Sequence, residues 1–256
     1  MKKDSMWRAL GLISILQIAP THADEKKEEG PQRSYTWGLG LGAAVQRKGY
    51  TDIDNDSLIL PLIYFDNRWV RLVGGSLDVK LPSAGPVEFS IAGRFQNDGY
   101  KASDAPILAG MAKRKESVWA GAAVNWRNGI VDLSAEWLTD VMTNSEGQQV
   151  KLSAEHSFRL GSFEVTPRVS GIWLDDKYVD YYYGVTPGEA LIGRPAYAGA
   201  STTNVELGIR TSYSFGGKQS VFLDVSSETF GDEIKNSPLV DRSSQVGAAV
   251  GYLYIF

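Results

Sequence analysis

The final segment of the chain, Val246-Gly-Ala-Ala-Val-Gly-Tyr-Leu-Tyr-Ile-Phe256, decides the fold. Side chains of a strand alternate between two faces, and this segment places Tyr252, Tyr254 and Phe256 on one face with smaller apolar residues. Outer-membrane barrels close on such an aromatic-ended strand, whose rings lie in the girdle at the membrane interface. The segment therefore predicts a barrel-closing strand. Taken alone, it also fits the last strand of a soluble β-sandwich.

The beginning of the chain predicts export. Lys2, Lys3 and Arg8 precede an apolar run, and small residues follow it at Thr21-His22-Ala23. This order is that of a secretory signal peptide, and the apolar run is shorter than the ~20 residues of a membrane-spanning helix. We expect residues 1–23 to be a signal peptide, 24–34 a charged, flexible periplasmic lead, and 35–256 the barrel.

Alternating runs of about ten residues, the length of a tilted membrane-crossing strand, recur through the rest of the chain. In the run 87–95, for example, Phe89 and Ile91 would face lipid while Glu88 and Arg94 face inward. Eleven such runs are recognisable, including a less regular one at 69–79. A barrel with both termini in the periplasm needs an even number of strands. The set of eleven therefore divides one strand in two or lacks one, and the segment 178–185 is a candidate for a missing strand. The prediction is an all-β, antiparallel, up-and-down transmembrane barrel of twelve strands, with ten as the alternative. Pro61 and Pro167 lie inside predicted strands, where a missing N–H weakens a ladder.

The connections alternate between short turns and three long loops, 96–116, 175–200 and 229–241. Bacterial barrels place short turns in the periplasm and long loops outside. One long loop carries a cluster of tyrosines, which we consider candidates for contact with a ligand or partner because tyrosine is enriched at recognition surfaces. The alternative is that this loop folds over the barrel mouth. The candidates are Tyr178, Tyr181, Tyr182 and Tyr183.

The predicted inner face carries charges of both signs. Because an isolated buried ion is very costly, these side chains must form ion pairs or line water. An internal ion-pair network is one reading, and a narrow channel for small polar solutes is the other. The candidate lumen-lining residues are Glu88, Arg94, Asp132, Glu136, Lys151, Glu155, Glu164, Arg168, Glu206, Arg210 and Asp224.

Enzymatic signals are weak. The chain has no cysteine, and His156 is the one histidine outside the predicted signal peptide. We therefore expect no catalytic residue, no cofactor and no metal site. The net charge of −4 lacks a basic stripe, so nucleic acid is not expected as a partner.

Several segments together resemble the MltA-interacting protein family, also called the MipA/OmpV family of outer-membrane proteins. They are Leu108-Ala-Gly-Met-Ala-Lys-Arg114, Tyr181-Tyr-Tyr-Gly-Val185 with Pro187-Gly-Glu-Ala190, Gly231-Asp-Glu-Ile-Lys-Asn-Ser-Pro-Leu-Val240 and Gly251-Tyr-Leu-Tyr-Ile-Phe256. The resemblance implies an outer-membrane barrel. In the namesake member it implies a scaffold that joins a lytic transglycosylase to a penicillin-binding protein.

The leading prediction is a non-enzymatic barrel in the outer membrane of a Gram-negative bacterium, which docks peptidoglycan-remodelling enzymes at its periplasmic turns and charged lead. Its expected partners are outer-membrane lipid, a lytic transglycosylase and a penicillin-binding protein. The alternatives are a narrow porin-like channel for small polar solutes and a surface adhesin that acts through the long loops. The sequence does not indicate an oligomeric state.

Overall fold

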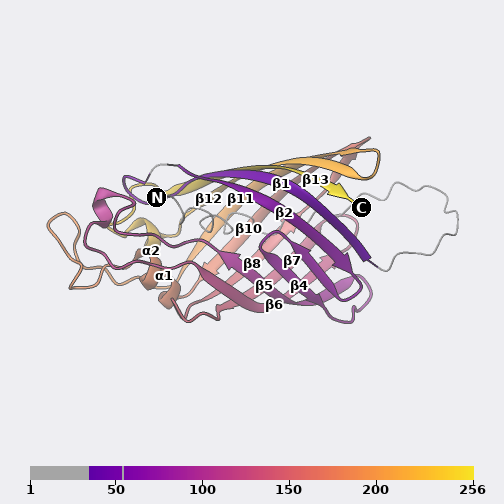
Figure 1. Ribbon diagram of the computed structural model, residues 1–256. Coiled ribbons are helices and arrows are strands. Elements are labelled where there is room, and N and C mark those ends of the chain that lie inside the picture. The colour runs from indigo at the N-terminus through magenta and orange to yellow at the C-terminus, as the bar shows by residue number, and fades with distance from the viewer. Residues whose placement is uncertain (1–34, 54) are drawn as a thin grey trace, which may run out of the picture.

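The computed structural model describes residues 35–53 and 55–256, so the predicted signal peptide and periplasmic lead lie outside the described residues. Antiparallel strands make up most of the described chain, and short helices lie at one end (Figure 1). The strands are β1 (Tyr35–Arg47), β2 (Asp56–Asn67), β3 (Val70–Val73), β4 (Ser76–Lys80), β5 (Val87–Gln96), β6 (Ser117–Arg127), β7 (Asp132–Asp140), β8 (Gln148–Glu155), β9 (Phe158–Leu160), β10 (Phe163–Leu174), β11 (Thr202–Phe215), β12 (Gln219–Thr229) and β13 (Ser244–Ile255). The helices are η1 (Pro106–Leu108), α1 (Asp176–Tyr183) and α2 (Asp232–Lys235).

The sheet closes on itself. The last strand, β13, pairs with the first strand, β1, over ten residue pairs from Gly38↔Ile255 to Arg47↔Val246. β10 pairs with β11 on one side and with both β8 and β9 on the other, so β8 and β9 share one position in the wall. The wall is a closed barrel of twelve antiparallel strands, which confirms the predicted fold and the higher of the two strand numbers.

The strand that the sequence pattern missed lies in the run 69–79. This run forms the hairpin of β3 and β4, which turns at Gly74, where a positive φ of 54° favours glycine. The proposal that the missing strand lies near 178–185 is wrong, because this segment forms α1. The Asp175 side chain accepts a hydrogen bond from the Tyr178 backbone N–H at 2.9 Å and so caps the start of the helix.

The β3–β4 hairpin is short and covers only one end of its neighbour. β2 pairs with β3 through three residues, Tyr64 to Asp66, although β2 is twelve residues long. Within the described chain, no strand pairs with this side of β2 between Asp56 and Leu62. The wall is therefore uneven, with a strand edge exposed beyond the tip of the hairpin.

Both strand prolines occupy positions where a backbone N–H is not needed. The Ile63 carbonyl accepts a hydrogen bond from Gly74, so the odd-numbered residues of β2 direct their backbone groups toward β3. The nitrogen of Pro61 consequently faces the unpaired side of β2. Pro167 faces the break between β8 and β9, and its carbonyl accepts a bond from His156. Proline is tolerated at such edges and interruptions.

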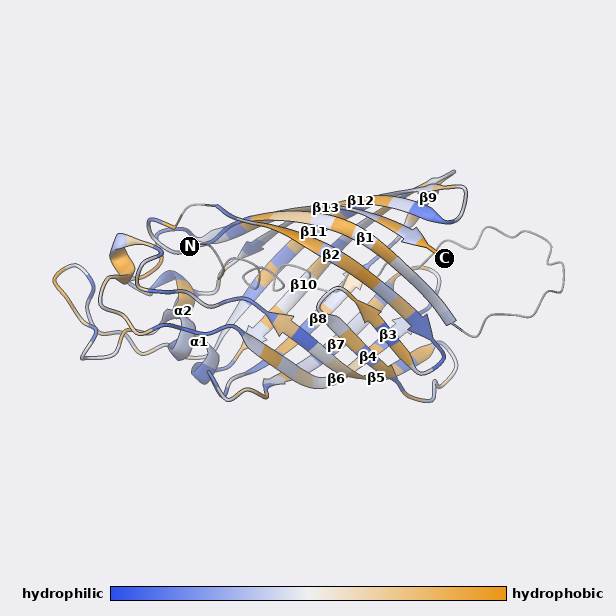
Figure 2. Ribbon diagram, viewed as in Figure 1, coloured by the Kyte–Doolittle hydropathy of each residue, from blue (hydrophilic) through white to orange (hydrophobic). Residues whose placement is uncertain are grey.

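Exposed and buried residues alternate along β1, β2 and β11. Figure 2 shows β2 as almost continuously apolar (orange), because its buried residues are apolar as well as its exposed ones. Ile91 and Leu207 are exposed on the outer face, while Ser90 and Glu206 are buried. One part of the inner face is apolar. Leu62, Phe222 and Leu253 form a buried cluster there, and a Cβ on Gly251 would lie 2.4 Å from the Phe222 ring. Phe222 thus packs inward.

The long loops lie at the end of the barrel opposite the C-terminus (Figure 1). At that end α1, α2 and the loops form a second apolar cluster, which includes Trp119 of β6 and Leu138 of β7. The start of β1 and the end of β13 lie at the same end of the barrel as the short turns. There the Phe256 N–H donates a hydrogen bond to the Trp37 carbonyl at 3.0 Å. Among the described helices, none has the length and apolar character needed to cross a bilayer.

Candidate functional site: the charged lumen

A first group of charged side chains surrounds Arg94 on β5. Its Nη2 atom lies 2.7 Å from Asp78 Oδ1 on β4 and 2.5 Å from Glu136 Oε2 on β7. Its Nη1 atom donates to the backbone carbonyls of Leu77 and Gly93. One guanidinium, exposed by only 7%, therefore joins three strands of the wall.

A second group centres on Arg168 of β10. Its Nη1 and Nη2 atoms bind the two carboxylate oxygens of Asp224 at 2.7 and 2.9 Å, and its Nε donates to Glu206 at 3.2 Å. Lys151 also binds Glu206, at 3.2 Å, and Arg210 binds Asp224, at 3.0 Å. A Cβ on Gly208 would lie 2.5 Å from Arg168 Cζ, so this glycine leaves the space through which the guanidinium passes.

The pairing explains how the barrel tolerates these charges. Each acid in the two groups contacts a cation from another strand, which offsets the cost of taking both from water. The arrangement mixes both signs around the lumen and forms no ring of one charge, the arrangement that would select ions by sign.

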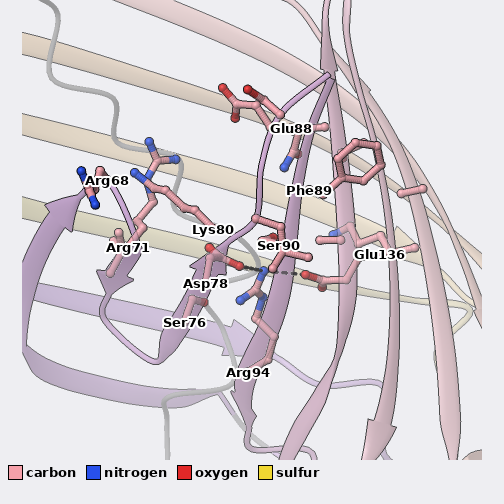
Figure 3. A pocket seen from close by; sticks show the side chains of 18 residues that line it. Arg68, Arg71, Ser76, Asp78, Lys80, Glu88, Phe89, Ser90, Arg94 and Glu136 are labelled. Carbon is pink, nitrogen blue, oxygen red and sulfur yellow. Dashed lines mark hydrogen bonds and ion pairs between the residues drawn. The ribbon is translucent and has the colours of Figure 1, made fainter. Parts of the chain in front are cut away.

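A cavity of about 250 Å³ lies beside the Arg94 group, at the end of the barrel that holds the short turns. We call it the periplasmic chamber, because the orientation predicted from the sequence places the short turns in the periplasm. Arg68 of the β2–β3 turn, Ser83 of the β4–β5 connection and Glu88 of β5 line its outer part. Figure 3 shows Asp78 and Glu136 on either side of the Arg94 guanidinium at its inner part.

A smaller cavity, of about 100 Å³, lies on the other side of the same ion pairs and reaches α1. Both cavities are lined by Arg94, Glu136 and Lys151. The Arg94 group therefore separates a chamber open toward the short turns from a space beneath the loop cluster.

The remaining sequence-predicted lumen residues lie outside these two groups. Glu88 is half-exposed, 3.4 Å from Arg127, and Glu164 pairs with exposed Arg159 at 2.9 Å. Asp132 and Glu155 face each other directly across β7 and β8. The described residues contain no group of three or more His, Asp or Glu side chains placed to hold a metal ion.

The tyrosines chosen as contact candidates lie on α1, and three of them are buried. Tyr178, Tyr182 and Tyr183 are exposed by 8% or less, and burial raises the pKa of each phenol above its ordinary value. A partner could reach only Tyr181 without moving the helix. The alternative, a loop folded over the barrel mouth, agrees better with this packing.

Contacts from three other loops hold α1 in place. The Tyr50 hydroxyl donates to the Tyr182 carbonyl at 3.1 Å, and the Ser237 hydroxyl donates to the Tyr183 carbonyl at 2.6 Å. The Tyr182 hydroxyl donates to the Lys115 carbonyl at 3.1 Å. We call α1, α2 and the loops joined to them the loop cap.

Glu189 is an anchor of the loop cap that sequence reasoning missed. It accepts hydrogen bonds from Arg114 at 2.9 and 3.1 Å and from the backbone N–H of Ala112 and Thr186. Burial by itself raises the pKa of this carboxyl, but the Arg114 and backbone hydrogen bonds outweigh it and lower the pKa to about 2.

Other charged residues of the lumen were also missed. Asp78 follows outward-facing Leu77 in the less regular run 69–79, so alternation alone could have found it. Glu228 binds Asn204 at 2.6 Å and Gln245 at 2.8 Å, near the end of β12. Its inward position depends on β12 continuing to Thr229, which the sequence pattern did not show.

The closed wall, the lipid-facing apolar residues and the paired charges inside define a transmembrane β-barrel of the outer membrane. Residues 39–256 match the family model described as "MltA-interacting protein MipA". The chain belongs to this family.

Relatives resemble the chain over most of its length. It is 27% identical to the MltA-interacting protein of Escherichia coli K12, with 97% of each chain covered. It is 24% identical to the putative outer membrane protein YiaT of the same organism, covering 85% of this chain and 90% of YiaT. It is 27% identical to the outer membrane protein OmpV of Vibrio cholerae, with 60% of each chain covered. None of these names specifies an enzymatic activity.

Among solved structures, the NanC porin is similar at 6% identity and a TM-score of 0.44, covering 84% of this chain and 98% of the porin.

Proposed function

We propose that this protein is a non-enzymatic docking barrel, which holds a peptidoglycan-remodelling enzyme at the periplasmic side of the outer membrane. The observation that carries the proposal is the match to the MltA-interacting protein, which spans 97% of both chains. The name of that relative points to a lytic transglycosylase as the enzyme. A penicillin-binding protein as a second partner follows from the family resemblance of the sequence.

The distribution of contacts supports this role. The inward charges of the two lumen groups are bound to one another, which is an arrangement suited to holding a wall together. Anchoring alone fixes a bound enzyme at the membrane, so a docking barrel needs no catalytic group. We place the docking surface at the short turns and the charged lead 24–34, because these segments would face the periplasm.

The test is direct binding of a purified lytic transglycosylase to the mature protein in lipid nanodiscs. We expect saturable binding that weakens when the lead 24–34 is replaced by a neutral sequence of the same length. The matched control changes Leu191→Ser and Ile192→Ser, two exposed apolar residues of the opposite end, and should bind as the wild type does. An enzyme that binds empty nanodiscs equally well would refute the proposal.

A narrow channel is the second candidate. The two cavities of about 250 and 100 Å³, which meet at the Arg94 group, favour it, because together they extend from the short turns to the loop cap. In this proposal the Arg94–Glu136 pair is the constriction that small polar solutes pass.

Planar-bilayer recording separates the two candidates. A channel should give reproducible conductance, which changes when Arg94→Gln alters the charge at the constriction, whereas Arg159→Gln, in the exposed strand β9, should leave it unchanged. Silent membranes containing correctly folded protein would exclude the channel and leave the docking role.

A further inference from the structure

Two cations bind the Asp66 carboxylate at the outer part of the periplasmic chamber, and a third lies on the same side of the chamber (Figure 3). Arg71 Nε lies 2.6 Å from Asp66 Oδ2, and Lys80 Nζ lies 2.5 Å from Asp66 Oδ1. Arg68, in the turn between β2 and β3, lines the same cavity. Figure 3 shows the side-chain nitrogens of Arg68, Arg71 and Lys80 gathered on one side of the chamber.

This cluster carries an excess of positive charge. Asp66 supplies one negative charge against the three cations, which leaves two positive charges. Among the described residues, no acid pairs with Arg68, whose guanidinium lies 4.3 Å above the Trp69 ring. The neighbouring acids are already engaged, since Asp78 and Glu136 bind Arg94, and Glu88 lies near Arg127.

The cluster also has hydrogen-bond donors that its contacts with Asp66 do not use. Arg71 binds Asp66 through Nε, so its two terminal nitrogens remain available for a second acceptor. A guanidinium presents a planar set of donors that matches carboxylate and phosphate oxygens. The Arg68 guanidinium rests on an aromatic face and can turn toward an anion by rotation of its side chain.

We propose that Arg68, Arg71 and Lys80 form an oxyanion-binding site, which takes the carboxylate or phosphate groups of a soluble ligand entering the chamber from the periplasm. The serine and asparagine side chains that line the chamber, Ser90, Ser134 and Asn125 among them, would contact the polar body of that ligand. The chamber of about 250 Å³ accommodates a small molecule or the end of a larger one.

The position of the cluster favours a soluble ligand over a lipid headgroup. Lys80 alternates along β4 with outward-facing Val79, and Arg71 alternates along β3 with Leu72, so both cations belong to the inner face. A phospholipid held in the bilayer would meet the outer face. Binding of an anionic lipid headgroup is therefore the competing outcome of the test.

The test is isothermal titration of the mature protein in neutral nanodiscs with inorganic phosphate and, separately, with a tripeptide of glutamate. We expect saturable binding that weakens with salt, together with a change in Trp69 fluorescence as Arg68 leaves the ring. Arg68→Gln and Arg71→Gln should each weaken binding by about tenfold or more, as expected for a charged hydrogen bond. Arg68→Gln removes no ion pair of the described structure, so it separates binding from folding.

Arg159→Gln is the matched control, because it removes the same charge from β9, at the same end of the barrel. Equal weakening by this control would show that net charge alone acts, and would overturn the site. Lack of saturable binding of both probes would also overturn it. If nanodiscs containing phosphatidylglycerol abolish phosphate binding to the wild type, a lipid headgroup occupies the cluster and the soluble ligand is refuted. The assay contains no enzyme, so its result does not depend on the docking proposal.

Discussion

At the scale of single residues, the lumen shows how a barrel wall tolerates buried ions. Arg168 binds two acids from two strands, and its bidentate contact with Asp224 fixes the guanidinium in one orientation. Gly208 is required for this contact, because any larger residue would occupy the space of the Arg168 guanidinium. A buried ion pair adds little net stability, but removal of one partner leaves an uncompensated charge.

We therefore expect Arg168→Met to destabilise the barrel by about 1.5–3 kcal/mol, the usual worth of hydrogen bonds to a charged group, because Asp224 and Glu206 each lose this partner but keep Arg210 and Lys151. The measurement is the midpoint temperature of heat-modifiable gel migration, supported by urea unfolding. Arg159→Met removes an exposed ion pair and should cost about 0–1 kcal/mol. Equal losses in the two variants would contradict the role given to Arg168.

Glu189 predicts a pH dependence of the loop cap. Its pKa is lowered to about 2 from an ordinary 4.5, so its contribution to stability is complete above the ordinary value and is lost as pH falls toward about 2. Amide exchange of residues 185–199, corrected for intrinsic rates, should accelerate over that range. Glu189→Gln should show fast exchange already at neutral pH.

The control for this experiment is Glu146→Gln. Glu146 belongs to an exposed ion pair with Lys177, so its loss should leave exchange in 185–199 unchanged. If acid leaves the wild-type exchange rates unaltered, the Arg114–Glu189 contact is not an anchor of the loop cap.

At the scale of elements, strand geometry decides where each proline is allowed. The sequence marked Pro61 and Pro167 as weak points, because proline lacks the N–H of a ladder bond. The adjacent strand that a backbone N–H faces depends on how the strands pair, and this pairing is known only from the folded structure. In the folded barrel both nitrogens face an unpaired edge or a break.

Moving the proline by one position should reverse this tolerance. The backbone of Leu60 faces β1 opposite Gly42, so Leu60→Pro removes a ladder hydrogen bond and leaves its acceptor unpaired, which costs about 1–3 kcal/mol. We expect loss of the heat-modifiable form in Leu60→Pro and its retention in Pro61→Ala. A stable barrel in Leu60→Pro would show that the assigned register of β2 is wrong.

At the scale of the whole molecule, the two ends of the barrel differ. The loop cap joins segments far apart in sequence, as in the stacked rings of Tyr50 and Tyr183, whose centroids lie 5.3 Å apart. The other end consists of short turns around the periplasmic chamber. A solute that enters or leaves the lumen at the loop end must therefore pass the loop cap (Figure 1).

This difference predicts the effect of removing α1. Replacing residues 176–199 by a short glycine-serine linker deletes α1, including Tyr178, whose ring packs on Trp119. We expect the planar-bilayer conductance of the deleted protein to exceed that of the wild type, because a barrier to ions is gone. The same deletion with Arg94→Gln should change the current further if the Arg94 group is the remaining constriction. Equal conductance before and after deletion would mean that the loop cap does not obstruct the lumen.

The sequence by itself determined the barrel, because side chains that alternate between hydrocarbon and a polar interior leave a period of two in the chain. The same period identified most charged residues of the lumen, including Arg94, Glu136 and Arg168. It failed at the β3–β4 hairpin, whose strands of four and five residues are too short to show a period, and at α1, whose tyrosines suggested an exposed surface.

Only the tertiary structure decided which charges meet. Arg94 and Glu136 are 42 residues apart, and Arg168 and Asp224 are 56 apart, so their contact depends on strand register and on closure of the wall. The pairing of Arg71 and Lys80 with Asp66 arises for the same reason, because a hairpin must fold back before its inner residues share one carboxylate. Periodicity reports the face on which a side chain lies, whereas the partner across the lumen is set by long-range pairing that leaves no local pattern in the sequence.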